Sequence, residues 1–121
     1  MVSFGILTIS HKRDKVLRLW CASVVRLRLQ MGFYFPVVVV GDAHHESICN
    51  EYEIRHITQV NDPVSQKWNT GVRYLMDQGV DYAMIIGSDD IISTPTMARF
   101  IIAMWPEPDM IGIKSIWFYA A

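Results

Sequence analysis

Residues 81–92 read DYAMIIGSDDII, and this stretch decides our interpretation of the fold. A short apolar run ends at a glycine–serine turn that is followed by two adjacent carboxylates, Asp89 and Asp90. An apolar run of this length between turn residues predicts a buried strand of a mostly parallel sheet. Ligands of open α/β sheets bind beyond the carboxyl ends of the strands, where the two carboxylates should stand. The pair therefore favours a divalent cation shared with a phosphate, and an ordinary turn or helix cap is the alternative.

On either side of this stretch the chain alternates between strand-like and helix-like patterns. Apolar, β-branched runs predict strands at 2–9, 35–40, 52–57, 109–113 and 115–119. Apolar residues at helical spacing predict helices at 14–31, 43–51, 63–78 and 94–105. Gly32 and Gly79 supply helix ends, while Asp62 and Pro63 form a helix start. The four valines at 37–40 indicate a central strand that is covered on both faces.

The alternation of strands and helices predicts an α/β fold, namely a Rossmann-like and mostly parallel sheet with helices on both faces. We expect one domain over residues 1–121. Because the carboxyl ends of parallel strands meet at one edge, the segment 8–12, Asp42 and the Asp89–Asp90 pair should converge there. That edge would gather polar residues suited to a nucleotide and a metal.

Composition and charge exclude several classes of protein. Hydrophobic residues make up 51% of the chain and the mean hydropathy is +0.20, so either a covered sheet buries them or apolar surface awaits a partner, such as a second copy of the chain. The formal net charge of −1, without a basic block, argues against nucleic-acid binding. Cys21 and Cys49 have neither zinc nor disulfide spacing. No signal peptide and no apolar run of about 20 residues are evident, so we expect a cytoplasmic protein without a transmembrane segment.

Three motifs together resemble a known family. A valine-rich strand ends in Asp42, a later helix carries KWNTG at 67–71, and a strand then leads into GSDD at 87–90. This order is similar to the nucleotide-binding half of a family-two-like glycosyltransferase of the GT-A fold, over about residues 2–113. The resemblance implies transfer of a sugar from a nucleoside-diphosphate sugar to an acceptor hydroxyl. It also implies a divalent metal, Mn²⁺ or Mg²⁺, as cofactor.

The resemblance implies roles for individual residues as well. Asp42 matches the aspartate that binds the nucleotide base, and Lys67 with Asn69 matches a basic residue followed by Asn-x-Gly. Asp89 and Asp90 match the acids that hold the metal. The remaining donor-binding candidates are Thr8, Ile9, Ser10 and Ser88. No catalytic base is assigned, because the acidic residues that follow the metal motif flank prolines.

Two departures from the family pattern point to an alternative function. Gly87 stands where the family has the first acid of its metal motif, so one carboxylate is missing. The family's acceptor-binding segment has no counterpart in residues 1–121. The alternative is a catalytically inactive module that binds a nucleotide or a partner on the same fold. Other common nucleotide binders are disfavoured, because neither Gly-x-Gly-x-x-Gly nor Gly-x-x-x-x-Gly-Lys-Ser/Thr occurs.

Each candidate residue also has a purely structural interpretation. Asp42 can cap the helix that follows it, and Lys67 can be a solvated lysine on a helix. His44 and His45 should point in different directions on a helix and lack i, i+4 spacing, so no metal site is predicted there. The helical apolar positions expected to face the core include Trp68, Val72, Leu75, Met76 and Trp105.

Overall fold

The elements follow the predicted alternation of strands and helices. The computed structural model describes residues 2–60 and 63–112. The strands are β1 (Phe4–Ser10), β2 (Val37–Gly41), β3 (Arg55–Thr58) and β4 (Tyr82–Ile85). The helices are α1 (Asp14–Met31), the 3₁₀ turn η1 (Ala43–His45), α2 (Glu46–Glu51), α3 (Val64–Asp77) and α4 (Thr94–Met104). No helix within these described ranges is both long and apolar enough to cross a membrane.

The four strands form one parallel sheet in the order β3-β2-β1-β4. In the register of this sheet, Ser10 of β1 lies opposite Gly41 of β2, and Leu7 of β1 lies opposite Ile85 of β4. Because all four strands run in the same direction, their carboxyl ends reach one edge of the sheet. This is the Rossmann-like α/β architecture that the sequence predicts.

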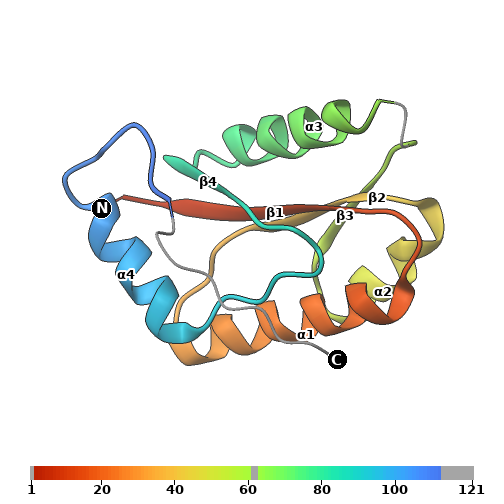
Figure 1. Cartoon of the computed structure of the whole chain (residues 1–121), viewed down its shortest axis with the longest axis horizontal. Helices are drawn as coiled ribbons and strands as arrows, with labels where there is room; N and C mark the ends of the chain where they lie inside the picture. The colour runs from red at the N-terminus through yellow and green to blue at the C-terminus, as the bar shows by residue number, and fades with distance from the viewer. Residues whose placement is uncertain (1, 61–62, 113–121) are drawn as a thin grey trace.

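Helices cover the two faces of the sheet unequally. Figure 1 shows α1, α2 and α4 on one face and α3 alone on the other. Phe4 and Ile6 of β1 pack into the larger core under α1, whereas Leu7 packs with Leu75 beneath α3, as the alternation of side chains along a strand requires. The four valines of β2 are buried, which confirms a strand covered on both faces. Each such fully buried apolar side chain stabilises the fold by roughly 1.5–3 kcal/mol.

Two glycines explain how helices end and how closely they pack. Gly32 adopts a φ of 76° and ends α1, as predicted. A Cβ on Gly71 would lie only 2.9 Å from Cδ1 of Leu7. The glycine inside α3 therefore permits a close approach of this helix to β1. Pro63 is the residue that caps α3 rather than its first helical residue, and Asp62 lies outside the described residues.

Several expectations about apolar segments are wrong. Within the described sheet β4 is an edge strand, and Ile85 is 60% exposed because α3 lies over β1 and β2. Met76 is exposed because the buried stripe of α3 runs through Lys67, Gly71 and Leu75. Trp105 is exposed because it follows the last residue of α4. Residues 109–112 form no strand, and 113–121, including the strand predicted at 115–119, lie outside the described residues.

Candidate functional site

The carboxyl edge of the sheet is built where β1 and β2 end side by side. Ser10 and Gly41, the last residues of these strands, are paired. A Cβ on Gly41 would overlap the hydroxyl and the main-chain oxygen of Ser10, so this spacing requires glycine. From the α3 face, Lys67 reaches the same point, and its Nζ donates a hydrogen bond to the main-chain oxygen of Ser10 at 2.7 Å. Three elements thus meet at the end of β1.

Asp42 follows β2 and anchors the loop between β1 and α1. Its Oδ2 accepts a hydrogen bond from the main-chain N–H of Lys12 at 2.8 Å, and its Oδ1 lies 3.0 Å from Nδ1 of His11. Burial alone would raise the pKa of Asp42, but these two hydrogen bonds and the charge of Lys67 lower it to about 2. The carboxylate is therefore ionised at neutral pH. Although Asp42 precedes η1, its side chain makes no capping hydrogen bond there.

Lys67 carries a buried charge. The alternative interpretation, a solvated lysine on the surface of a helix, is therefore wrong. Its side chain is fully buried. Burial lowers its pKa, and the nearby carboxylate of Asp42 opposes that shift. An ammonium group has three donors, of which one is committed to Ser10. Lys67 therefore contributes positive charge to this edge from beneath the surface.

The second part of the carboxyl edge follows β4. The strand order changes direction between β1 and β4, and open α/β sheets bind ligands at such a switch point. The main-chain N–H of Asp90 donates to the oxygen of Gly87 at 3.0 Å and closes a turn. A Cβ on Gly87 would lie 2.8 Å from Oδ2 of Asp90 and 3.1 Å from Oδ1 of Asp89. The two carboxylates therefore converge over a space that glycine leaves open.

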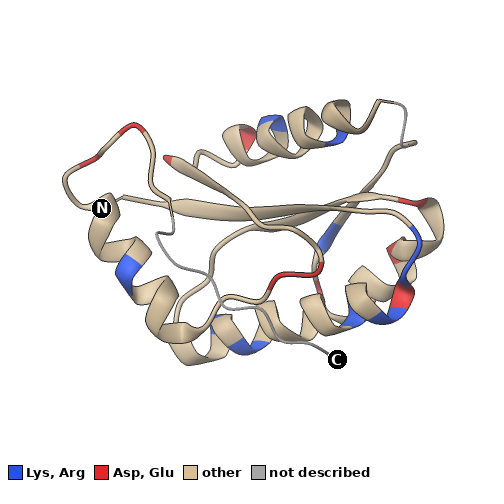
Figure 2. Ribbon diagram, in the orientation of Figure 1, with Lys and Arg blue, Asp and Glu red and all other residues tan. Residues whose placement is uncertain are grey.

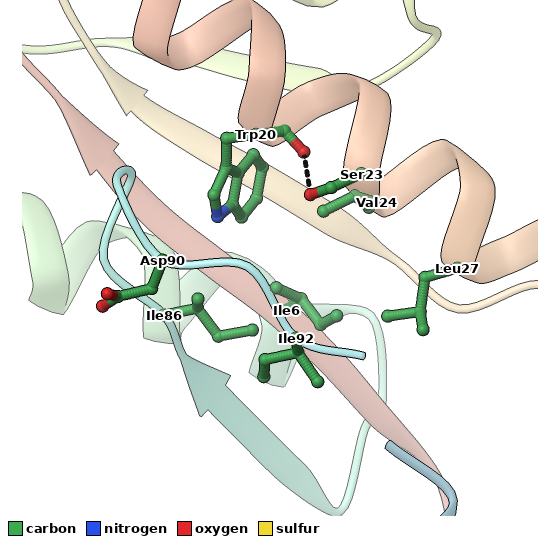
Figure 3. A pocket seen from close by; sticks show the side chains of 8 residues that line it. All are labelled: Ile6, Trp20, Ser23, Val24, Leu27, Ile86, Asp90 and Ile92. Atoms are coloured by element: carbon green, nitrogen blue, oxygen red, sulfur yellow. Dashed lines mark hydrogen bonds between the residues drawn. The ribbon is translucent and has the colours of Figure 1, made fainter. Parts of the chain in front are cut away.

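The surroundings of this acidic turn, residues 87–90, are apolar on the side that faces the sheet. Figure 2 shows the turn, in red after β4, on the side of the sheet that α1 covers. Next to it is a hollow of about 10 Å³, room for roughly one water. Trp20, Ile6 and Ile92 are among the side chains that line it (Figure 3). In Figure 3 the carboxylate of Asp90 points away from these apolar side chains. Any ligand of the turn must therefore bind on its outer side.

A larger hollow lies elsewhere on the molecule. It has a volume of about 360 Å³, is open to solvent, and is lined by Val2, Asp81, Trp105 and Glu107. Val2 and Asp81 precede β1 and β4, so this hollow lies at the amino end of the strands. It is therefore separate from the edge that the sequence singled out.

The other donor-binding candidates differ in how accessible they are. Thr8 is fully buried and Ser10 is 4% exposed. Ile9 is half-buried and packs on the α3 side. Ser88 is half-buried within the acidic turn. A nucleotide at this edge would therefore meet the main chain after β1 more readily than the Thr8 side chain.

Asn69 stands apart from the other candidates. It is exposed on α3, whereas Lys67, two residues earlier, faces the sheet. Side chains two residues apart on a helix point in nearly opposite directions. The structure thus gathers Ser10, Asp42 and Lys67 at one place and the two aspartates after β4 at another, and it leaves Asn69 on the outer face of its helix.

A polar cluster that no sequence pattern indicates lies beside this edge. Nδ1 of His45 is 2.7 Å from Oγ of Ser10, and its Nε2 is 2.9 Å from Oδ1 of Asp14. Nε2 of His44 lies 2.9 Å from the same Oδ1. The two imidazole centroids are 4.2 Å apart, so the expectation that adjacent histidines point apart is wrong. Hydrogen bonds from His44 and His45 lower the pKa of Asp14.

Ser10, His45 and Asp14 have the connectivity of a hydrolase triad, but not its accessibility. A catalytic serine must present its Oγ to a substrate carbonyl. Here Ser10 is 4% exposed and its hydroxyl lies against Gly41. The hydrogen bonds therefore fix the end of β1 to α1 and η1, and they do not form a nucleophilic site.

Comparisons with known proteins add no family to these findings. No protein-family model matches the chain, and no curated protein is significantly similar to it in sequence. The fold class accordingly rests on the parallel sheet and its helices. Any functional conclusion rests on the chemistry of the carboxyl edge.

Proposed function

We propose that this chain binds the diphosphate of a nucleoside-diphosphate sugar through a divalent cation, as the donor-binding part of a GT-A-like glycosyltransferase. The observation that carries the proposal is the convergence of Asp89 and Asp90 over Gly87 at the switch point of the sheet. Two exposed carboxylates from one short turn offer the hard oxygen ligands that Mn²⁺ and Mg²⁺ prefer. The acceptor would be a hydroxyl compound.

The space over Gly87 fits such a cation. Only glycine leaves the volume between the two carboxylates open, since a Cβ would come within 2.8 Å of Asp90 and 3.1 Å of Asp89. Asp89 and Asp90 would hold the cation, with the diphosphate oxygens and water as its other ligands. When bound, a divalent cation there stabilises the negative charge that gathers on the leaving diphosphate. On this proposal the first acid of the family's motif is absent at Gly87, and an open space between the Asp89 and Asp90 carboxylates takes its place.

The other half of the edge would orient the nucleoside. Asp42 is ionised at neutral pH and partly exposed, so it can accept a hydrogen bond from a base N–H, which gives specificity rather than rate. The buried charge of Lys67 adds positive potential for a bound anion. We assign no general base for the acceptor, because none of the described acidic residues past the turn stands at this edge.

One observation favours the alternative, an inactive nucleotide-binding or partner-binding module. Lys67 is fully buried and its Nζ is committed to Ser10. A lysine that stabilises the charge on the leaving diphosphate has to reach that diphosphate directly. On this alternative the same edge binds a nucleotide without transferring a sugar.

The experiment is calorimetric titration of the chain with uridine diphosphate, with and without Mn²⁺. Wild type should bind only with the metal, and Asp89→Ala should weaken this binding at least about tenfold. The matched control is Asp77→Ala, because Asp77 is an exposed aspartate at the end of α3. Binding that is independent of metal, or equal loss in Asp77→Ala, would contradict the proposal.

A second measurement separates the enzyme from the inactive module. Release of uridine diphosphate from uridine-diphosphate sugars is followed with Mn²⁺ present, in wild type and in Asp89→Ala. Turnover that depends on Asp89 supports the transferase. Metal-dependent binding without turnover, across a panel of sugars and acceptors, supports the inactive module.

A further inference from the structure

Three side chains of metal-ligating types meet beside the carboxyl edge, away from the acidic turn. Asp14 is the first residue of α1, and His44 and His45 belong to η1. Their ligand atoms, one carboxylate oxygen and two imidazole nitrogens, all lie within 4.8 Å of one another. Both Nε2 atoms are 2.9 Å from the same Oδ1 of Asp14. Two segments 30 residues apart thus present three ligands to one point.

We propose that Asp14, His44 and His45 form a binding site for a zinc-class transition-metal cation. Zinc binds imidazole nitrogen and carboxylate oxygen at about 2.0–2.2 Å, so ligands of a tetrahedral site stand roughly 3.3 Å apart. The two N···O distances of 2.9 Å are therefore only a few tenths of an ångström shorter than a bound ion requires. An outward shift of the exposed Asp14 carboxylate, with a rotation of the exposed His44 ring, would bring the three ligand atoms to this spacing.

The burial of the three ligands suits a preformed but accessible site. His45 is fully buried, so packing holds its ring in place. The side chains of Asp14 and His44 are 52% and 56% exposed, so an ion can enter from solvent. The open side also leaves room for water as a fourth ligand, as in zinc sites with three protein ligands.

The second nitrogen of His45 is held as in known zinc sites. A zinc-bound histidine nearly always directs its other ring nitrogen at a hydrogen-bond partner, which fixes the ring and its tautomer. Here Nδ1 of His45 is 2.7 Å from Oγ of Ser10. With the ion on Nε2, the ring proton resides on Nδ1 and is donated to that hydroxyl. The cluster therefore has both ligands and an outer partner.

The ligand atoms of this site favour a different metal from those of the acidic turn. Two imidazoles and one carboxylate suit Zn²⁺ or Co²⁺, whereas the all-oxygen pair Asp89 and Asp90 suits Mn²⁺ or Mg²⁺. The inference does not rest on the proposed function, since a zinc site here is independent of nucleotide binding. It would join the start of α1 to η1 across the edge of the sheet.

The test is titration of the chelator-treated full chain with Zn²⁺ in competition with a chromogenic chelator. Wild type should bind one equivalent, and His44→Ala should weaken this binding by at least about tenfold. His11→Ala is the matched control, because His11 is an exposed histidine that contacts Asp42 and not the cluster. Circular dichroism confirms that each variant is folded, and Asp14→Asn provides a second variant with the same side-chain shape.

Two further measurements decide the outcome. Co²⁺ bound in place of Zn²⁺ should give the absorption of tetrahedral coordination without a thiolate charge-transfer band, since Cys21 and Cys49 are not ligands. Asp89→Ala should bind Zn²⁺ as wild type does. The proposal is overturned if wild type and His44→Ala bind Zn²⁺ equally, if His11→Ala loses binding as much as His44→Ala does, or if the thiolate band appears.

Discussion

Nζ of Lys67 lies 2.7 Å from the main-chain oxygen of Ser10, so a buried ammonium group joins α3 to the end of β1. The same serine is held from the other face of the sheet, because its Oγ lies 2.7 Å from Nδ1 of His45. The end of β1 is thus fixed from both faces by polar groups. Because the lysine is buried and bonded at this point, we expect its charge state to affect the stability of the fold.

Lys67→Met should change how stability depends on alkaline pH. Burial lowers the pKa of Lys67 below its ordinary value of 10.5. Between the lowered pKa and 10.5 the unfolded chain binds more protons than the folded chain, so the free energy of unfolding rises with pH there. Methionine cannot titrate, and the variant should lack this rise. Urea unfolding at several pH values up to 10.5 measures both slopes, and equal slopes would contradict the assignment.

His56→Phe should stabilise the protein. Among the described residues, neither ring nitrogen of His56 makes a hydrogen bond of ordinary distance and angle, although both atoms are buried and the main chain of Asp42 lies nearby. A buried polar group without a partner costs about 1–3 kcal/mol, and phenylalanine has a similar shape and suits a strand. We expect the free energy of unfolding at pH 7.5 to rise by about 1 kcal/mol. A loss of stability would show that the imidazole has a partner.

The same variant should also remove a dependence on acidic pH. Burial, the largest cause, lowers the pKa of His56 below 6.5, and His45 lowers it further while Asp42 and Glu46 oppose the shift. Stability of wild type should therefore fall as the pH falls below 6.5, because the unfolded state binds the proton first. His56→Phe should show a smaller loss between pH 6.5 and 5. Parallel curves for the two proteins would refute this assignment.

Much of the fold follows from local patterns in the sequence. The helical spacing over 14–31 and the glycine at 32 give the bounds of α1 because both signals act within a few residues. The four valines place β2 inside the sheet for the same reason. Exposure of Ile85 and Trp105 was not predictable in this way. For Ile85 it depends on which strands α3 covers, which is a relationship between distant segments. For Trp105 it depends on the exact residue at which α4 ends, and local signals fix a helix end only to within one or two residues.

The sequence predicts some residues of the candidate site and not others, for the same reason. The carboxylates of Asp42 and Asp89 follow strands, and a parallel sheet necessarily brings strand ends to one edge. The approach of His44 and His45 to Asp14 is not contained in their spacing. The direction of Cβ on a helix does not fix where a long ring ends, and Asp14 comes from a segment 30 residues earlier in the chain than His44.

Gly41→Ala should lower the free energy of unfolding by a large amount for a single substitution. A Cβ at this position would overlap both the hydroxyl and the main-chain oxygen of Ser10. Neither atom can move easily, because Ser10 is paired with β2 and bonded to His45 and Lys67. We expect a loss of about 1–3 kcal/mol in the free energy of unfolding. Gly112→Ala is the control, since its added Cβ has no atom of the described residues within 4 Å apart from its own chain neighbours, and a similar loss in both would argue against a specific overlap.

Gly87→Ala tests the open space in the acidic turn under the proposed function. The added Cβ would displace the carboxylates of Asp89 and Asp90, which are exposed and can move at little cost to stability. The free energy of unfolding should therefore change by less than about 1 kcal/mol. Mn²⁺-dependent binding of uridine diphosphate should weaken about tenfold or more, measured by calorimetry. Unchanged affinity would mean that the metal does not use the space over Gly87.

Gly87→Asp should weaken Mn²⁺ binding, although it adds a carboxylate to the acidic turn. The substitution restores the acid that the glycosyltransferase family, which this chain resembles, carries at this position. The number of carboxylates alone would therefore predict tighter metal binding. The geometry predicts the opposite, because the new side chain begins only 2.8 Å from Oδ2 of Asp90 and 3.1 Å from Oδ1 of Asp89. Like charges at such distances repel and push the ligands apart. Weaker Mn²⁺ binding than in wild type supports a cation site in the open space over Gly87. Tighter binding would show that the turn rearranges around a third acid.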